Sequence, residues 1–181
     1  MSLAPQTLTV MGIDPGSRIL GYGILCQRGN QVSHVHSGSI KCNSSWSLDQ
    51  RLRLIHIELL EIIKVYKPQM FAMETIFHAK NIKSVFTLAH ARGVAMLCAS
   101  MNDIPVHEYS PIEVKRACSG YGRASKEQIS EMMSRLFGLE KKHIQSMDQT
   151  DALSIALCHL NTWRIKERVQ SSRVSSEHIT K

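Results

Sequence analysis

The stretch that most constrains this chain is LTVMGIDPGSRILGYG at residues 8–23, where an apolar run ends on a single carboxylate, Asp14. Pro15 and Gly16 follow at once, and the chain then turns back through glycines into a second apolar run at residues 21–27. Two such runs joined by turn residues predict a pair of neighbouring strands. A carboxylate at the mouth of a buried strand is costly to desolvate. Asp14 is therefore either a simple turn residue, as in many D-P-G sequences, or a ligand for a cation such as a metal ion.

Composition limits the class of protein in which this motif sits. The chain has 181 residues, of which 43% are hydrophobic and 20% charged, so it is long enough for one globular domain with a core. Its net charge of +7 favours a polyanionic partner. Its five cysteines are scattered without a C-x-x-C pair, which argues against a disulfide framework or a zinc site. With no apolar run of the roughly 20 residues that a membrane helix needs and no signal peptide, we expect a cytoplasmic protein without a membrane partner.

The hydrophobic pattern predicts alternating strands and helices, and therefore an α/β fold. We expect three strands in an antiparallel meander (7–13, 21–27 and 31–41), a helix (47–66), a fourth strand (69–74), a long helix (84–100), a fifth strand (105–109), helices starting after Ser110 and Ser125, and a last helix (146–163). Since a helix separates the third and fourth strands, the fourth is expected to lie parallel to the first. We expect one domain over residues 7–164, followed by a basic, disordered tail over 165–181.

Small residues recur along the helix predicted at 84–100. Ala89, Gly93 and Leu97 follow one another at intervals of four and so share a helix face. Such a groove serves either tight packing on the sheet or a symmetric contact with a second subunit. The pattern favours neither reading.

A glycine-containing loop, SGYGRA at residues 119–124, is flanked by basic residues. Arg123 lies within it, Lys115 and Arg116 precede it, and Lys126 follows it at the first position of a helix. A cation at that position is disfavoured by the helix dipole by about 0.3–1 kcal/mol. Lys126 is therefore either a phosphate contact or an ordinary solvated lysine.

Three further carboxylates accompany Asp14. Glu74 ends the fourth strand, and because parallel neighbours bring their carboxyl ends together, it is expected to face Asp14 at one edge of the sheet. Asp148 and Asp151 are three residues apart and share one face of the last helix. Four converging carboxylates without Cys or His ligands select Mg²⁺, with Mn²⁺ as a substitute. Two such ions can support hydrolysis of a phosphodiester, and the basic surface suits a nucleic acid.

Four blocks in this order, GIDPGSRILGYG, METIFHAKN, VKRACSGYGRASKEQ and DQTDALSIALCHL, resemble the RuvC family of Holliday junction resolvases, within the ribonuclease H-like superfamily. The resemblance covers roughly residues 10–160. It implies a ribonuclease H-like mixed five-stranded sheet flanked by helices, with a three-stranded antiparallel meander and further parallel strands. It also implies a structure-selective endodeoxyribonuclease of DNA recombination and repair that nicks two strands of like polarity symmetrically and leaves 5′-phosphate and 3′-hydroxyl ends.

The same resemblance assigns roles to residues of this chain. It makes Asp14, Glu74, Asp148 and Asp151 the catalytic ligands of Mg²⁺, with two ions expected per active site. It makes Phe77 an aromatic that stacks on a base near the crossover, and the candidate DNA contacts further include Lys80, Lys115, Arg123 and Lys126. The implied partners are a four-way DNA junction, a second copy of the chain joined through the helix at 84–100, and the RuvA and RuvB branch-migration proteins. The family pattern has an acid where this chain has Ser125.

Two other functions are compatible with parts of the pattern. An actin-like ATPase also carries a D-x-G phosphate loop after its first strand, but such a protein needs two domains around its nucleotide, and this chain has room for one. A junction-binding protein of the same fold without catalysis is the second alternative. Four clustered acids facing phosphates argue against it, since they would weaken binding without metal ions.

Overall fold

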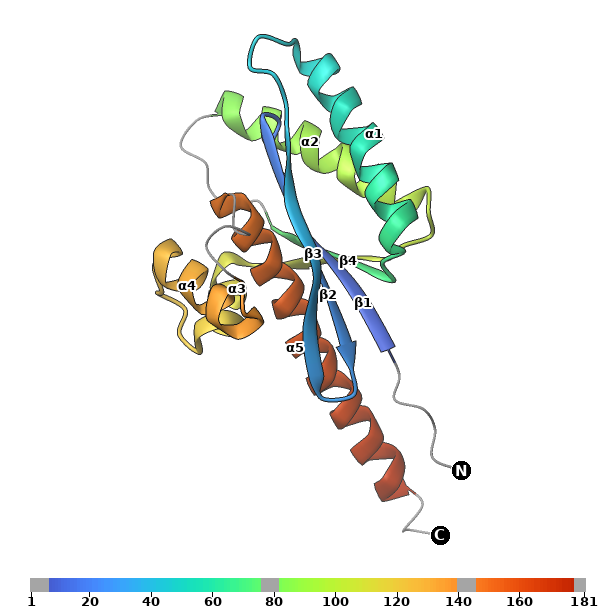
Figure 1. The fold of residues 1–181 in the computed structure, drawn as a ribbon. Helices are drawn as coiled ribbons and strands as arrows, with labels where there is room; N and C mark the ends of the chain where they lie inside the picture. Colours follow the sequence, from blue (N-terminus) through green and yellow to red (C-terminus); the bar gives the residue numbers. More distant parts are fainter. Residues whose placement is uncertain (1–6, 76–81, 140–145, 178–181) are drawn as a thin grey trace.

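The computed structural model of the chain describes residues 7–75, 82–139 and 146–177, without the side chains of Lys83 and residues 164–177. Its strands and helices follow one another in the order that the sequence predicts (Figure 1). They are β1 (Thr7–Asp14), β2 (Ile19–Arg28), β3 (Gln31–Lys41), α1 (Leu48–Tyr66), β4 (Met70–Glu74), α2 (Ile82–Ser100), β5 (Val106–Tyr109), α3 (Pro111–Ser119), α4 (Lys126–Phe137) and α5 (Met147–Glu177).

The sheet has the predicted mixed topology. Its five strands lie in the order β3-β2-β1-β4-β5. The meander β1-β2-β3 is antiparallel, whereas β4 lies parallel to β1 and β5 parallel to β4. The carboxyl ends of β1, β4 and β5 therefore meet at one edge of the sheet, as the sequence predicted for the first and fourth strands.

Helices cover both faces of the sheet (Figure 1). Along β1, side chains alternate between the faces: Met11 and Ile13 pack with residues of α1 and α2, whereas Val10 packs with residues of α5, α3 and α4. Asp14 has the parity of Val10 and therefore belongs to the α5 face. This alternation decides which helix can supply ligands beside Asp14.

The helices begin where capping residues predicted them. Reciprocal side-chain to backbone bonds form capping boxes between Ser47 and Gln50, between Ser110 and Glu113, and between Ser125 and Gln128. The last box places Lys126 at the first position of α4, as expected.

Three predicted boundaries differ from the structure by two residues or more, and the first is the start of α2, at Ile82 instead of at residue 84. Strand β2 begins at Ile19, two residues before the predicted start at Gly21. Helix α5 continues to Glu177, whereas a disordered tail was predicted from residue 165. The segment that extends the helix contains neither Gly nor Pro, and adding residues to an existing helix avoids the cost of nucleation. None of the described helices is long and apolar enough to cross a membrane.

Candidate active site

Asp14 and Glu74 end two neighbouring parallel strands. The register pairs Ile13 of β1 with Met73 of β4, so the two carboxylates occupy the next position on each strand. Backbone bonds continue beyond β4, where the amide of Thr75 donates to the carbonyl of Tyr109 at the end of β5. The sheet itself thus fixes the spacing of the first two acids.

Helix α5 brings the other two acids to the same edge because glycines of the sheet let its backbone approach closely. Gly21 pairs with Asp14 across the β1–β2 ladder, and a Cβ built on Gly21 would lie 2.1 Å from the carbonyl oxygen of Asp148. A Cβ on Gly12 would lie 2.0 Å from the carbonyl oxygen of Ala152. Only glycine fits at such distances. The first turn of α5 therefore lies directly over the strand pair that carries Asp14.

The electrostatics show that the four acids act on one another. Burial raises the pKa of Asp14 from 3.8 to about 7, with further contributions from the charges of Asp151, Asp148 and Glu74. Burial also raises the pKa of Glu74, followed by the charge of Asp151. Like charges held together in a desolvated site are expected to behave in this way.

Lys126 partly compensates this negative charge. Its Nζ lies 2.7 Å from Oδ2 of Asp151, and the side chains of the lysine and the aspartate are 66% and 22% exposed. Its charge lowers the pKa of both Asp14 and Glu74, and that of Lys115 lowers the pKa of Glu74. The start of α4 and helix α3 thus deliver two cations to the rim of the acidic cluster.

The donor set fits a hard divalent cation. Among the described residues, no group of three or more His, Cys, Asp or Glu side chains already lies in an arrangement that holds a metal ion. However, the acids offer carboxylate oxygens alone, and burial together with their mutual repulsion raises the pKa of Asp14 to about 7 in the presence of Lys126. A divalent ion among them would relieve this repulsion more effectively than a single ammonium group.

The sequence analysis missed one residue that supports this site. Arg92 of α2 is only 8% exposed, and its Nη1 donates to the backbone carbonyl of Glu74 at 2.7 Å, while its Nη2 bonds to Oε1 of Glu108 on β5. It therefore ties the end of β4 to β5 and to α2. No spacing in the sequence points to it, because an arginine within a helix is ordinarily exposed.

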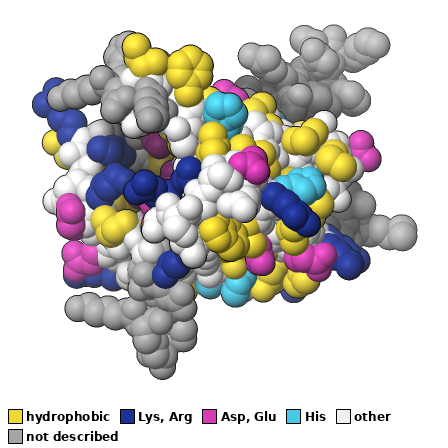
Figure 2. Space-filling view, turned by 90° about the horizontal axis from the view of Figure 1, so that it is seen from above, with side chains coloured by type: hydrophobic (Ala, Val, Ile, Leu, Met, Phe, Trp, Pro, Cys, Tyr) yellow, Lys and Arg dark blue, Asp and Glu magenta, His cyan; other side chains and the backbone are white. Residues whose placement is uncertain are grey.

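Of the remaining predicted site residues, the structure describes only Arg123. Arg123 lies exposed between α3 and α4, and within the described ranges it makes no ion pair. Phe77 and Lys80 fall outside the described residues. Seen from above, the surface shows Lys and Arg side chains gathered beside a hollow in which acidic side chains are visible (Figure 2).

Known proteins share this sequence and this fold. The family model described as "Crossover junction endodeoxyribonuclease RuvC" matches residues 10–159. A protein of that name from Syntrophotalea carbinolica is 42% identical over 160 residues, covering 88% of this chain and 98% of the relative. One from Alkaliphilus metalliredigens is 40% identical over 155 residues, covering 86% and 94%.

Solved structures agree with these relatives. The structure described as T. thermophilus RuvC in complex with Holliday junction substrate superposes with a TM-score of 0.82 at 29% identity, covering 88% of this chain and 96% of that one. The yeast mitochondrial Holliday junction resolvase Ydc2 shares the fold, with a TM-score of 0.61 at 16% identity over 87% of this chain and 79% of that one.

Proposed function

Because this chain belongs to the RuvC family of crossover junction endodeoxyribonucleases, we propose that it resolves Holliday junctions by metal-dependent hydrolysis of phosphodiester bonds. The reaction nicks two strands of like polarity symmetrically and leaves 5′-phosphate and 3′-hydroxyl ends. The observation that carries the proposal is the burial of Asp14 beside Asp148, Asp151 and Glu74: burial first, and then the charges of these three acids, raise its pKa to about 7. A cluster of this kind destabilises the folded protein unless bound cations neutralise it.

In the proposed mechanism the four acids hold Mg²⁺, for which Mn²⁺ can substitute. When bound, two such ions would activate a water and stabilise the leaving oxygen. Lys126, which bonds to Asp151, would exchange this carboxylate for the scissile phosphate once the acids are neutralised. Lys115 of α3 would contact the same DNA backbone, since it is close enough to Glu74 for its charge to lower the pKa of that acid. Lysine suits this role as a mobile point charge.

The substrate and partners follow from the same proposal. The DNA junction would lie across the edge where β1 and β4 end, with Arg123, Phe77 and Lys80 as further contacts. A second copy of the chain would supply the second active site, and RuvA and RuvB would be the branch-migration partners. The cytoplasm remains the proposed location.

The decisive experiment compares cleavage of a synthetic four-way junction with cleavage of linear duplex, each with and without Mg²⁺. We expect cleavage of the junction alone and only with the metal. Asp14→Asn should abolish this cleavage while binding in Ca²⁺ remains measurable, because one ligand is lost and the DNA surface is retained.

Each rival predicts a different result. A junction-binding protein without catalysis would bind the junction in Ca²⁺ and leave it intact in Mg²⁺. An actin-like ATPase would hydrolyse ATP and ignore the junction. Cleavage by Asp14→Asn at the wild-type rate would remove Asp14 from the catalytic set.

A further inference from the structure

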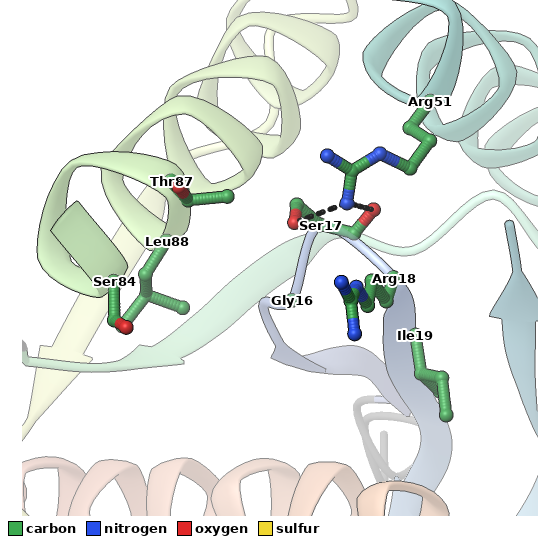
Figure 3. A pocket seen from close by; sticks show the side chains of 8 residues that line it. All are labelled: Gly16, Ser17, Arg18, Ile19, Arg51, Ser84, Thr87 and Leu88. Carbon is green, nitrogen blue, oxygen red and sulfur yellow. Dashed lines mark hydrogen bonds between the residues drawn. The ribbon is translucent and has the colours of Figure 1, made fainter. Parts of the chain in front are cut away.

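A second concave site adjoins the acids on the opposite side of the β1–β2 turn. It has a volume of about 650 Å³ and is lined by residues 16–19 of the turn, by Arg51 of α1, and by Ser84, Thr87 and Leu88 of α2 (Figure 3). The pocket and the acids lie on opposite faces of the sheet, because Asp14 belongs to the face covered by α5 whereas α1 and α2 cover the other face. Among the described residues, the turn at 15–18 connects Asp14 to this pocket.

Arg51 is positioned for binding by contacts that leave part of its guanidinium group available. Its Nη1 donates to Oγ of Ser17 at 3.0 Å and to the backbone carbonyl of Ser17 at 3.4 Å, and its Nε donates to the carbonyl of Ser47 at 3.4 Å. Within the described ranges, Nη2 has no hydrogen-bond partner, and the group faces the pocket (Figure 3). A guanidinium fixed on one side and open on the other loses little conformational entropy when it binds an anion.

Arg18 adds a second cation to the same pocket. Its backbone is fixed, because the amide of Cys42 donates to its carbonyl at 2.8 Å, while its side chain is exposed and extends beside the pocket (Figure 3). Neither arginine forms an ion pair with a described residue, and no carboxylate lines the pocket. Two uncompensated guanidinium groups over a wall that includes a serine hydroxyl constitute an anion site.

We propose that this pocket binds a backbone phosphate of the DNA strand that is cut, at a position next to the acidic cluster. This inference rests on the proposed function. A strand whose scissile phosphate lies over Asp14 must pass the short turn at residues 15–18 if it continues toward α1, and it then reaches Arg18 and Arg51. Arginine pairs that grip a flanking phosphate would set the position of the scissile bond relative to the acids.

The first test measures how junction binding depends on salt, in Ca²⁺ so that no cleavage occurs. Each phosphate contact contributes about 0.7–0.9 to the slope of log affinity against log salt. Arg18→Ala should therefore lower the slope by about that amount and weaken binding about tenfold. Arg53→Ala is the matched control: it removes the same charge from α1, where Arg53 lines a different pocket with Trp46. It should leave the slope unchanged.

The second test locates the phosphate. Junctions that carry a single neutral methylphosphonate are scanned along the cut strand. One position beside the scissile bond should weaken binding by the wild type about tenfold and have no further effect on Arg18→Ala. Arg51→Ala should behave like Arg18→Ala. Because Arg51 also anchors the turn that contains Ser17, the circular dichroism of the Arg51→Ala protein is recorded to check that it folds. If it does not fold, the result for Arg18→Ala alone decides whether the pocket binds a phosphate.

The outcomes separate the two proposals. If the wild type binds the junction but Arg18→Ala shows the wild-type slope, or if the methylphosphonate effect persists in that variant, the pocket is not a phosphate site. If the wild type itself does not distinguish the junction from linear duplex, the proposed function fails instead.

Discussion

Asp14 is held where its negative charge is unfavourable in the absence of a cation. Desolvation is the largest cause of the rise in its pKa, and the charges of Asp151, Asp148 and Glu74 add to it. The charge of Lys126, whose Nζ bonds to Asp151, offsets part of this effect. A bound divalent ion would reverse the balance, since it favours the ionised form of every acid in the cluster.

This balance predicts how stability depends on pH. The pKa of Asp14 is 3.8 in the unfolded reference and about 7 in the folded protein. Between these values the folded state keeps a proton that the unfolded state has lost, so the free energy of unfolding of the metal-free protein decreases as the pH rises from about 4 to about 7. Glu74, whose pKa is also raised, contributes with the same sign. Thermal melts in EDTA across this range should show the decline.

Two further melts test the cause. The melting temperature of Asp14→Asn should fall less as the pH rises, because this variant lacks the main titrating group. Mg²⁺ should raise the melting temperature of the wild type more at the upper end of the range, where Asp14 is ionised. A decline of equal size in Asp14→Asn would show that other groups dominate.

At this scale the sequence predicted the residues whose position follows from strand order. Asp14 and Glu74 end two neighbouring parallel strands, and Asp148 and Asp151 share one face of a helix. Each pair could therefore be placed from the sequence pattern. The support that Arg92 gives to Glu74 depends on how α2 crosses β4 and β5. The packing of α2 on the sheet sets that crossing, and such packing produces no periodic pattern in the sequence.

At the scale of elements, the contact between α5 and the sheet decides whether the two pairs of acids meet. Gly12, Gly21 and Gly23 each face the backbone of α5 at distances too short for a Cβ. Gly21 and Gly23 of the opening motif lie in β2, as the predicted strand at residues 21–27 implied, and their missing side chains make room for α5. Their spacing of two residues on one strand was the available signal, since it places them on the same face.

Gly21→Ala should therefore separate the acids. The new Cβ would lie 2.1 Å from the carbonyl oxygen of Asp148, so the first turn of α5 has to move. We expect a loss of stability of about 1–3 kcal/mol and a fall in cleavage rate on the order of 100-fold, because displacement of ligands by about 1 Å is costly. Denaturant unfolding and single-turnover cleavage measure the two effects.

Gly93→Ala provides the comparison for stability. A Cβ on Gly93 of α2 has no atom within 4 Å apart from its local neighbours, and alanine is the better helix former. At a protein concentration low enough to keep the chain monomeric, this variant should be at least as stable as the wild type. A Gly21→Ala protein with wild-type stability and cleavage rate would mean that the close approach of α5 does not position Asp148.

At the scale of the whole molecule, α2 exposes more apolar surface than a helix of an isolated domain needs. Ile82, Phe86 and Leu97 are 74%, 62% and 54% exposed, and Met101 just beyond the helix is 63% exposed. The groove predicted on this helix, Ala89, Gly93 and Leu97, is exposed, whereas Ala91, Ala95 and Cys98 are buried on the core side. Exposed apolar residues along one helix indicate an interface, and the symmetric nicking that we propose requires two active sites.

The dimer is therefore tested by placing a charge on this face. Leu97→Asp should shift the protein from dimer to monomer in sedimentation velocity, because a carboxylate in the centre of an apolar contact is desolvated without a partner. Paired nicking of a four-way junction should be lost with the dimer. Val65→Asp is the matched control, since Val65 is 66% exposed and belongs to a different helix, α1. A wild-type protein that sediments as a monomer at assay concentration and still makes paired nicks would exclude the symmetric contact, and the apolar face of α2 would then require a different partner.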